Sequence, residues 1–128
     1  KNVPQVYADL DILALTSENE GTPVSIIEAM ASSVPVIATN AGGVIDLLGS
    51  PNGIPSLKGF VVCERGIFCR KNDAIGFANG LEYLVRIDKE KKQQLLIQAR
   101  SFVKEHFSEK RLIRDIESLY LDLMTNKK

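Results

Sequence analysis

The chain has 128 residues, a formal net charge of zero, 45% hydrophobic and 25% charged residues. These proportions indicate a soluble globular domain that is long enough to bury its own core, and they exclude disordered and fibrous classes. No apolar run approaches the roughly 20 residues of a membrane-spanning helix, and no charged-then-apolar signal stands at the start.

The first informative segment is a strand followed by a turn and a helix. Residues 11–15 form a short apolar run of strand length. Thr22 and Pro23 follow, and a threonine before a proline predicts an N-cap with the proline at the first helical position. The segment therefore predicts a strand, a turn and a helix that starts at about residue 23.

Two glutamates bracket this predicted helix start. Glu20 falls in the turn, and Glu28 falls about two turns into the helix, roughly 9 Å along its axis. Turns at the carboxyl ends of parallel strands bind ligands, because their amides are unpaired and the helix dipole is positive there. The pattern favours an anionic ligand that carries hydroxyls, while each glutamate taken alone also fits a solvated surface residue.

The whole string from residue 17 to residue 46 is more specific than either glutamate. It resembles the family-4 retaining glycosyltransferases of the GT-B fold, whose carboxy-terminal domain carries a Glu-x7-Glu motif at the spacing of Glu20 and Glu28. The resemblance implies an α/β class: a Rossmann-like three-layer α/β/α domain with a short parallel sheet, the C-terminal half of a GT-B fold, and a helical C-terminal tail.

The resemblance also implies roles for single residues. Glu20 would accept hydrogen bonds from donor-sugar hydroxyls and is the candidate catalytic-site residue, and Glu28 would hold the ribose hydroxyls. The backbone amides of four residues would face the sugar and the diphosphate: Gly21, Thr22, Val24 and Ser25. Pro23 has no N–H to offer at this position.

The resemblance continues on both sides of the motif. Residues 7–11 look like the end of the helix before the motif strand, and residues 59–62 look like a later strand. A loop is expected between Gly43 and Gly59, because glycine and proline recur there. Residues 63–71 are interpreted as an insertion, a hairpin over the edge of the site.

The remaining sequence predicts a helical tail. Asp73 caps a helix to about residue 87, a second runs from about residue 89 to residue 106, and Ser108 opens a third. The third carries a full apolar stripe: Leu112, Ile113, Ile116, Leu119, Tyr120, Leu123 and Met124. Within one partial domain, 1–128, we expect an α/β part at 1–71 and helices at 72–128, with a candidate homodimer contact along 112–124.

Metal and thiol chemistry are not expected. The sequence has no Asp-x-Asp and no His or Cys cluster with ligand spacing, and the two cysteines, Cys63 and Cys69, are interpreted as structural. His106 is expected at a helix end rather than as a base. We therefore expect no metal and no cofactor, with the nucleotide-sugar donor as a substrate.

Charge is divided unevenly along the chain. Residues 1–85 carry 5 basic and 9 acidic side chains, and residues 86–128 carry 11 basic and 7 acidic ones. The basic tail is a candidate for peripheral membrane contact, although its alternating signs are typical of a solvated helix face. No dense basic cluster indicates nucleic acid. The expected location is the cytoplasm, with the inner membrane face as a candidate.

These expectations combine into one functional hypothesis. The chain is the donor-binding C-terminal part of a retaining glycosyltransferase of glycan, polysaccharide or lipopolysaccharide biosynthesis, and its N-terminal acceptor-binding domain lies outside the sequence. We expect this piece alone to be inactive. Two alternatives remain: half of a GT-B sugar epimerase, and a non-enzymatic flavodoxin-like interaction module.

Overall fold

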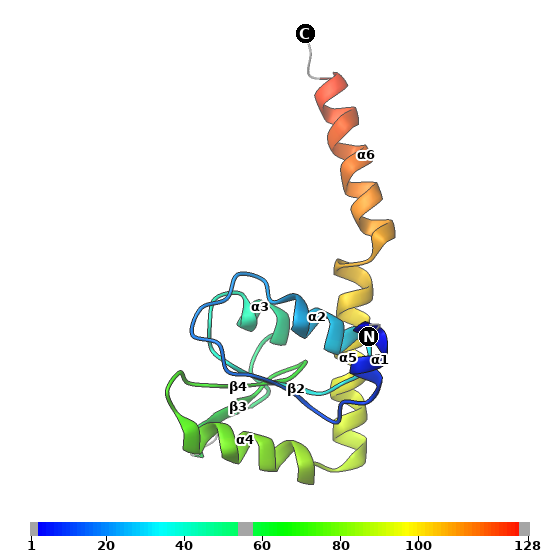
Figure 1. Cartoon of the computed structure of the whole chain (residues 1–128). Coiled ribbons are helices and arrows are strands. Elements are labelled where there is room, and N and C mark those ends of the chain that lie inside the picture. The colour runs from blue at the N-terminus through cyan, green and yellow to red at the C-terminus, as the bar shows by residue number, and fades with distance from the viewer. Residues whose placement is uncertain (1–2, 54–57, 126–128) are drawn as a thin grey trace.

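The structure is a computed structural model that describes residues 3–53 and 58–125. Helices alternate with strands in the first part of the chain, and three helices end it (Figure 1). In chain order the elements are α1 (Val3–Ala8), β1 (Leu13–Leu15), α2 (Val24–Ala31), β2 (Val36–Thr39), α3 (Val44–Leu48), β3 (Phe60–Val62), β4 (Ile67–Cys69), α4 (Ala74–Arg86), α5 (Lys89–His106) and α6 (Glu109–Thr125).

The sheet has the strand order β1-β2-β4-β3. β1 pairs with β2 in parallel, β2 pairs with β4 in parallel, and β3 runs antiparallel to β4. β2 is buried along its whole length, which fits its continuous run of β-branched and small residues. The predicted α/β class with a helical tail is confirmed, and the sheet is mixed because its outer edge is antiparallel.

Helices cover both faces of the sheet. α2 and α3 lie on one face and α4 on the other, while α5 packs against α2 (Figure 1). Two cores result, one on each face. The α2 side buries residues such as Ile26, Met30 and Leu48, and the α4 side buries Ile37 and Leu84. The parallel strands therefore end together at one edge, with helices above and below.

The helix of the motif starts one residue later than expected. Pro23 is the N-cap of α2, and no side chain caps this helix, so the predicted N-cap role of Thr22 is wrong. Pro23 has extended backbone angles and its carbonyl accepts the first bond, from the Ile26 amide at 3.1 Å. The proline ring fixes φ at a value that suits both the N-cap and the first helical position, so the sequence alone does not distinguish these two positions.

The segments after β2 differ from expectation in two places. Helix α3 lies inside the region predicted as a loop, of which residues 54–57 lie outside the described residues. The predicted hairpin exists, as β3 and β4 joined by a turn at Glu64 and Arg65. However, β4 lies within the sheet and pairs in parallel with β2. The turn therefore lies at the amino edge, opposite the predicted site.

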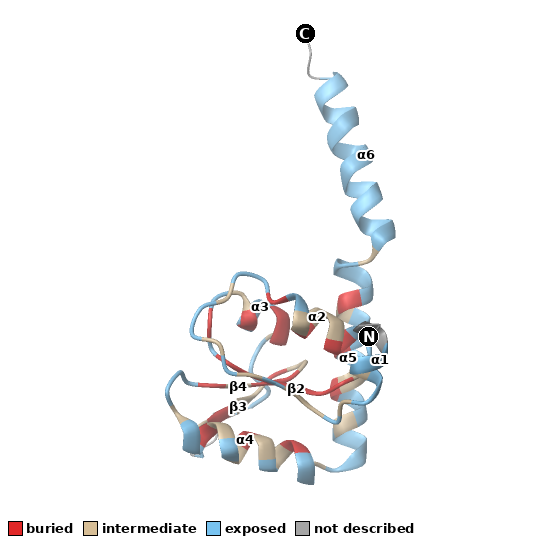
Figure 2. Ribbon diagram, viewed as in Figure 1, coloured by how far each residue is buried: buried red, intermediate tan, exposed pale blue. Residues whose placement is uncertain are grey.

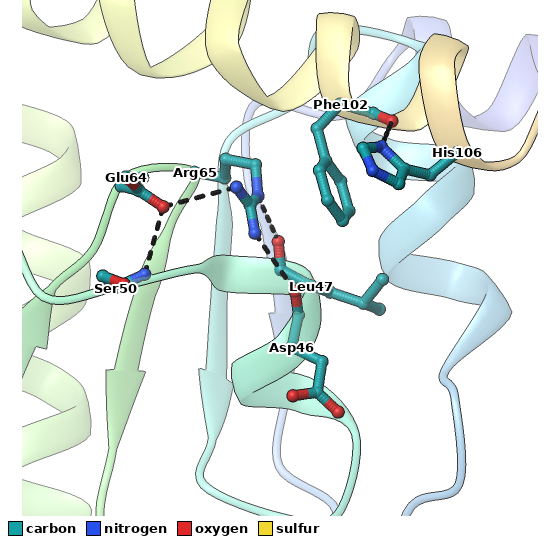
Figure 3. Close-up of polar contacts among 7 residues, drawn as sticks. All are labelled: Asp46, Leu47, Ser50, Glu64, Arg65, Phe102 and His106. Carbon is teal, nitrogen blue, oxygen red and sulfur yellow. Dashed lines mark hydrogen bonds and ion pairs between the residues drawn. The ribbon is translucent and has the colours of Figure 1, made fainter.

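Arg65 joins this turn to two helices (Figure 3). Its guanidinium donates to the carbonyl oxygens of Leu47 at 2.6 Å and Asp46 at 3.1 Å, which are unpaired carbonyls at the end of α3. It also lies 3.7 Å from the ring centroid of Phe102 on α5 and 3.4 Å from the Glu64 carboxylate. Arg65 thus fixes the C-terminal end of α3 against α5.

The helical tail agrees with the predicted caps. The Asp73 side chain accepts from the Gly76 amide at 2.8 Å, and the Ser108 hydroxyl accepts from the Arg111 amide at 3.3 Å. α6 projects away from the body and is exposed along its length (Figure 2). Its apolar stripe has no partner within the described residues. Among those residues no helix is both long and apolar enough to cross a bilayer.

Candidate functional site

The Glu-x7-Glu segment lies where the parallel strands end. β1 ends at Leu15 and is followed by the loop 16–23, which leads into α2. We call residues 16–23 the motif loop. The hydroxyl of Thr39, the last residue of β2, donates to the Ser17 carbonyl at 2.5 Å. The start of the motif loop is therefore fastened to the neighbouring strand, at the edge where open α/β sheets bind ligands.

Two glycines hold a second loop against the motif loop. The Gly43 amide donates to the Gly21 carbonyl at 2.9 Å. A Cβ on Gly42 would lie 1.6 Å from the Glu20 carbonyl oxygen, and its φ of +53° is in the left-handed region. Only glycine fits at this position without displacing a backbone. The sequence at 40–43 therefore sets the position of the Glu20 backbone.

The motif loop and the start of α2 present free backbone donors. Among the described residues, no partner accepts from the amides of Gly21, Thr22, Val24 or Ser25. These are the four amides that the sequence resemblance assigns to the sugar and the diphosphate. All four residues are exposed or half-buried, so the amides can be hydrated in the free protein. Unpaired donors at a helix N-terminus suit an anionic group.

The two glutamates occupy different environments. Glu20 is half-buried in the motif loop, and its side chain has no hydrogen-bonding or ionic partner among the described residues. Glu28 is half-buried in the second turn of α2, roughly 6 Å along the axis from Val24. Its Oε2 accepts a hydrogen bond from the Tyr7 hydroxyl at 2.7 Å. One carboxylate is thus free and the other is oriented by α1.

A pocket of about 480 Å³ opens at the same edge of the sheet, beside α4. Thr16 and Thr39 lie on its sheet side, and Phe77 and Leu81 are on its α4 side. Arg70, which follows β4, also lines it and has no ion-pair partner among the described residues. The edge of the sheet therefore combines unpaired amides and two carboxylates with a largely apolar pocket, whose charged lining residues are Arg70 and Asp73, the cap of α4.

The other candidate groups lie elsewhere. His106 is the last residue of α5, and its Nδ1 contacts the Phe102 carbonyl at 2.9 Å. Burial raises the pKa of the Cys63 thiol and of the Cys69 thiol to about 11, so both stay protonated at neutral pH. The part of the chain that is described holds no group of three or more His, Cys, Asp or Glu side chains placed to bind a metal ion.

Sequence reasoning missed three residues near the motif. Tyr7 was placed only at a helix end, Thr39 only in the string after the motif, and Arg70 only in the insertion. Tyr7 and Thr39 form hydrogen bonds with residues 21 and 22 positions away, and Arg70 lies at this edge because β4 pairs with β2. No local pattern signals such contacts, because they depend on which strands become neighbours.

Comparisons with known proteins show which proteins this chain resembles. The chain is 28% identical over 127 residues to N-acetyl-alpha-D-glucosaminyl L-malate synthase of Bacillus anthracis, covering 99% of this chain and 30% of that protein. It is 29% identical over 114 residues to the capsular polysaccharide biosynthesis glycosyltransferase CapM of Staphylococcus aureus, covering 89% of this chain and 27% of that protein. The chain thus spans less than a third of the length of these relatives.

A solved structure shares the fold. Anabaena HepE in complex with UDP superposes with a TM-score of 0.76 at 23% identity, over 93% of this chain and 29% of that one. The sequence profile described as glycosyl transferases group 1 matches residues 1–102, which is well over half of the chain. The chain therefore belongs to the glycosyl transferases group 1 family.

Proposed function

We propose that the chain is the donor-binding part of a retaining glycosyltransferase of family 4, and that the motif loop with α2 binds a nucleoside diphosphate sugar. The observation that carries the proposal is the set of four unpaired amides between two half-buried carboxylates at the carboxyl edge of the sheet. The family membership gives this arrangement a chemical context, and UDP in the HepE complex suggests a first probe.

The two carboxylates would divide the ligand between them. A carboxylate accepts hydrogen bonds and donates none, so it suits paired hydroxyls. Glu20, in the loop and without a partner, would accept from hydroxyls of the donor sugar. Glu28, deeper in α2, would accept from the ribose. The amides between them would meet the diphosphate and stabilise the negative charge that develops on it as the sugar leaves.

The same proposal covers the parts that the chain does not supply. An N-terminal domain would bind the acceptor, and further cations would bind the diphosphate, so the 128-residue chain alone would transfer no sugar. The reaction would need neither a metal ion nor another cofactor. The enzyme would act in the cytoplasm on glycan, polysaccharide or lipopolysaccharide acceptors, with a peripheral contact to the inner membrane face through the basic helices, and without nucleic acid.

The test is a calorimetric titration of the chain with UDP, GDP and ADP. We expect one diphosphate to bind, and Glu28→Ala to weaken that binding about ten-fold, which is typical for the loss of hydrogen bonds to a charged group. Glu117→Ala is the matched control, because this glutamate lies on the exposed helix α6. Equal affinities of the wild type and Glu28→Ala would contradict the ribose role.

Glu20 is tested by comparing a diphosphate with its sugar form. Glu20→Ala should leave the affinity for the bare nucleoside diphosphate unchanged and should lower the affinity for the corresponding nucleotide sugar, because only the sugar would contact this carboxylate. An equal loss of affinity for both ligands would mean that Glu20 contacts the phosphates or maintains the conformation of the loop instead.

A further inference from the structure

The contact between Tyr7 and Glu28 joins two elements that the chain separates by a strand and a loop. The Tyr7 hydroxyl on α1 donates to Oε2 of Glu28 on α2 at 2.7 Å. The Tyr7 ring is half-buried and packs against the core on the α2 side of the sheet. Packing therefore holds the ring in place, and the hydroxyl approaches the carboxylate from one direction.

This contact leaves part of the Glu28 carboxylate available. A carboxylate has two oxygens that together accept about four hydrogen bonds. Tyr7 uses one acceptor site on Oε2, and no other described side chain forms a hydrogen bond or an ion pair with Glu28. Oε1 and the second acceptor site of Oε2 remain open. Three open acceptor sites on one fixed carboxylate, two on Oε1 and one on Oε2, are enough for the two adjacent hydroxyls of a ribose.

The hydroxyl of Tyr7 is suited to act as a permanent donor. Burial, the hydrogen bond to Glu28 and the negative charge of Glu28 raise the pKa of Tyr7 to about 12. The phenol is therefore protonated across the physiological range. A glutamate side chain loses rotational freedom when it binds a ligand, and a partner that already holds it reduces this cost.

We propose that Tyr7 is a positioning residue for nucleotide recognition: it holds the Glu28 carboxylate in the orientation that accepts both the 2′ and the 3′ hydroxyl of the ribose. The inference rests on the proposed function of Glu28 and adds a second residue to it. Tyr7 itself does not touch the nucleotide. Its contribution is specific for the ribose, since the carboxylate that it orients faces the sugar hydroxyls and not the phosphates.

The experiment measures ribose discrimination by NMR titration of the full chain with UDP and with 2′-deoxy-UDP. The variants are Tyr7→Phe, which keeps the ring and removes the hydroxyl, Glu28→Gln, and the double variant. Tyr120→Phe is the matched control, because Tyr120 is 66% exposed on α6. Circular dichroism and urea unfolding of each variant establish that it is folded.

We expect the wild type to bind UDP more tightly than 2′-deoxy-UDP. Tyr7→Phe should reduce this preference about five- to ten-fold, with little change in the affinity for 2′-deoxy-UDP. Tyr120→Phe should keep the preference, and Tyr7→Phe should have no further effect in the Glu28→Gln background. A wild-type preference that persists in Tyr7→Phe would overturn the inference and leave the proposed function intact. Tighter UDP binding by Tyr7→Phe would also overturn it, because Tyr7 would then compete with the ribose. A wild type that binds neither nucleotide would overturn both.

Discussion

Replacing Arg65 by alanine should destabilise the chain by about 3 kcal/mol. The guanidinium makes two charge-assisted hydrogen bonds to carbonyls at the end of α3, and each such bond contributes roughly 1.5–3 kcal/mol. Stacking on Phe102 adds roughly 1 kcal/mol. Two effects offset part of this sum: water hydrates the freed carbonyls, and the variant no longer has the desolvation cost of a guanidinium that is only 14% exposed. These offsets bring the net loss to about 3 kcal/mol, somewhat below the lower end of the sum.

Urea unfolding followed by far-UV circular dichroism measures this loss. With an m value of about 2 kcal/mol/M, the midpoint should fall by about 1.5 M. Arg86→Ala is the matched control: Arg86 also pairs with a glutamate, Glu82, but its side chain is 78% exposed. An exposed pair of this kind contributes about 0.3–0.5 kcal/mol, so the control midpoint should move by about 0.2 M.

Arg65→Lys separates charge from geometry. Lysine keeps the positive charge but loses the planar fork that reaches two carbonyls and stacks on a ring, so its stability should lie between those of the wild type and Arg65→Ala. Equal midpoints for Arg65→Ala and Arg86→Ala would refute the reasoning, because the contacts in Figure 3 would then carry no more free energy than a surface ion pair.

Three further predictions follow from other parts of the structure. In the same urea assay, Gly42→Ala should destabilise the chain by about 2–4 kcal/mol and Gly21→Ala by less than about 1 kcal/mol. The reason is that a Cβ at residue 42 would meet the Glu20 backbone, whereas a Cβ at residue 21 would meet nothing within 4 Å. Similar losses of stability in the two variants would contradict the close approach of Gly42 to Glu20. Because the pKa of Tyr7 is raised from 10.0 to about 12, its contribution to stability is complete below pH 10 and is lost as the pH rises through 12. Tyr7→Phe should flatten this alkaline decline, and an unchanged slope would count against the contact. The exposed stripe of α6 should cause self-association that increases with concentration, as measured by sedimentation velocity. Leu119→Glu should reduce this association, and the control variant Ser118→Glu should not. A monomer at every concentration would contradict this prediction.

The sequence predicted the elements whose signals are local. The tail is one example, because Asp73 and Ser108 are caps and the apolar residues that follow Ser108 repeat at the helical period. The motif strand and the start of α2 were found within two residues, by an apolar run and a proline. Membership of the glycosyl transferases group 1 family sets aside the flavodoxin-like alternative.

Features that depend on tertiary pairing were not predicted. The hairpin at 63–71 was expected over the site, yet β4 pairs with β2 and carries the turn to the opposite edge. Helix α3 was missed because it has only five residues and lies among glycines. The pairing of Tyr7 with Glu28 depends on α1 lying beside α2, and the approach of Gly42 to Glu20 depends on two loops lying side by side, so no local pattern predicts either contact.

The central claim is that the motif loop and α2 bind a nucleotide sugar. The most direct measurement is the map of backbone amide chemical-shift changes when UDP or a UDP-sugar is added to the isotopically labelled chain. We predict that the changes concentrate at residues 20–28 and 41–43, and that Gly21, Thr22, Val24 and Ser25 are among the largest. Changes confined to other surfaces, or no changes with any nucleoside diphosphate, would contradict the claim.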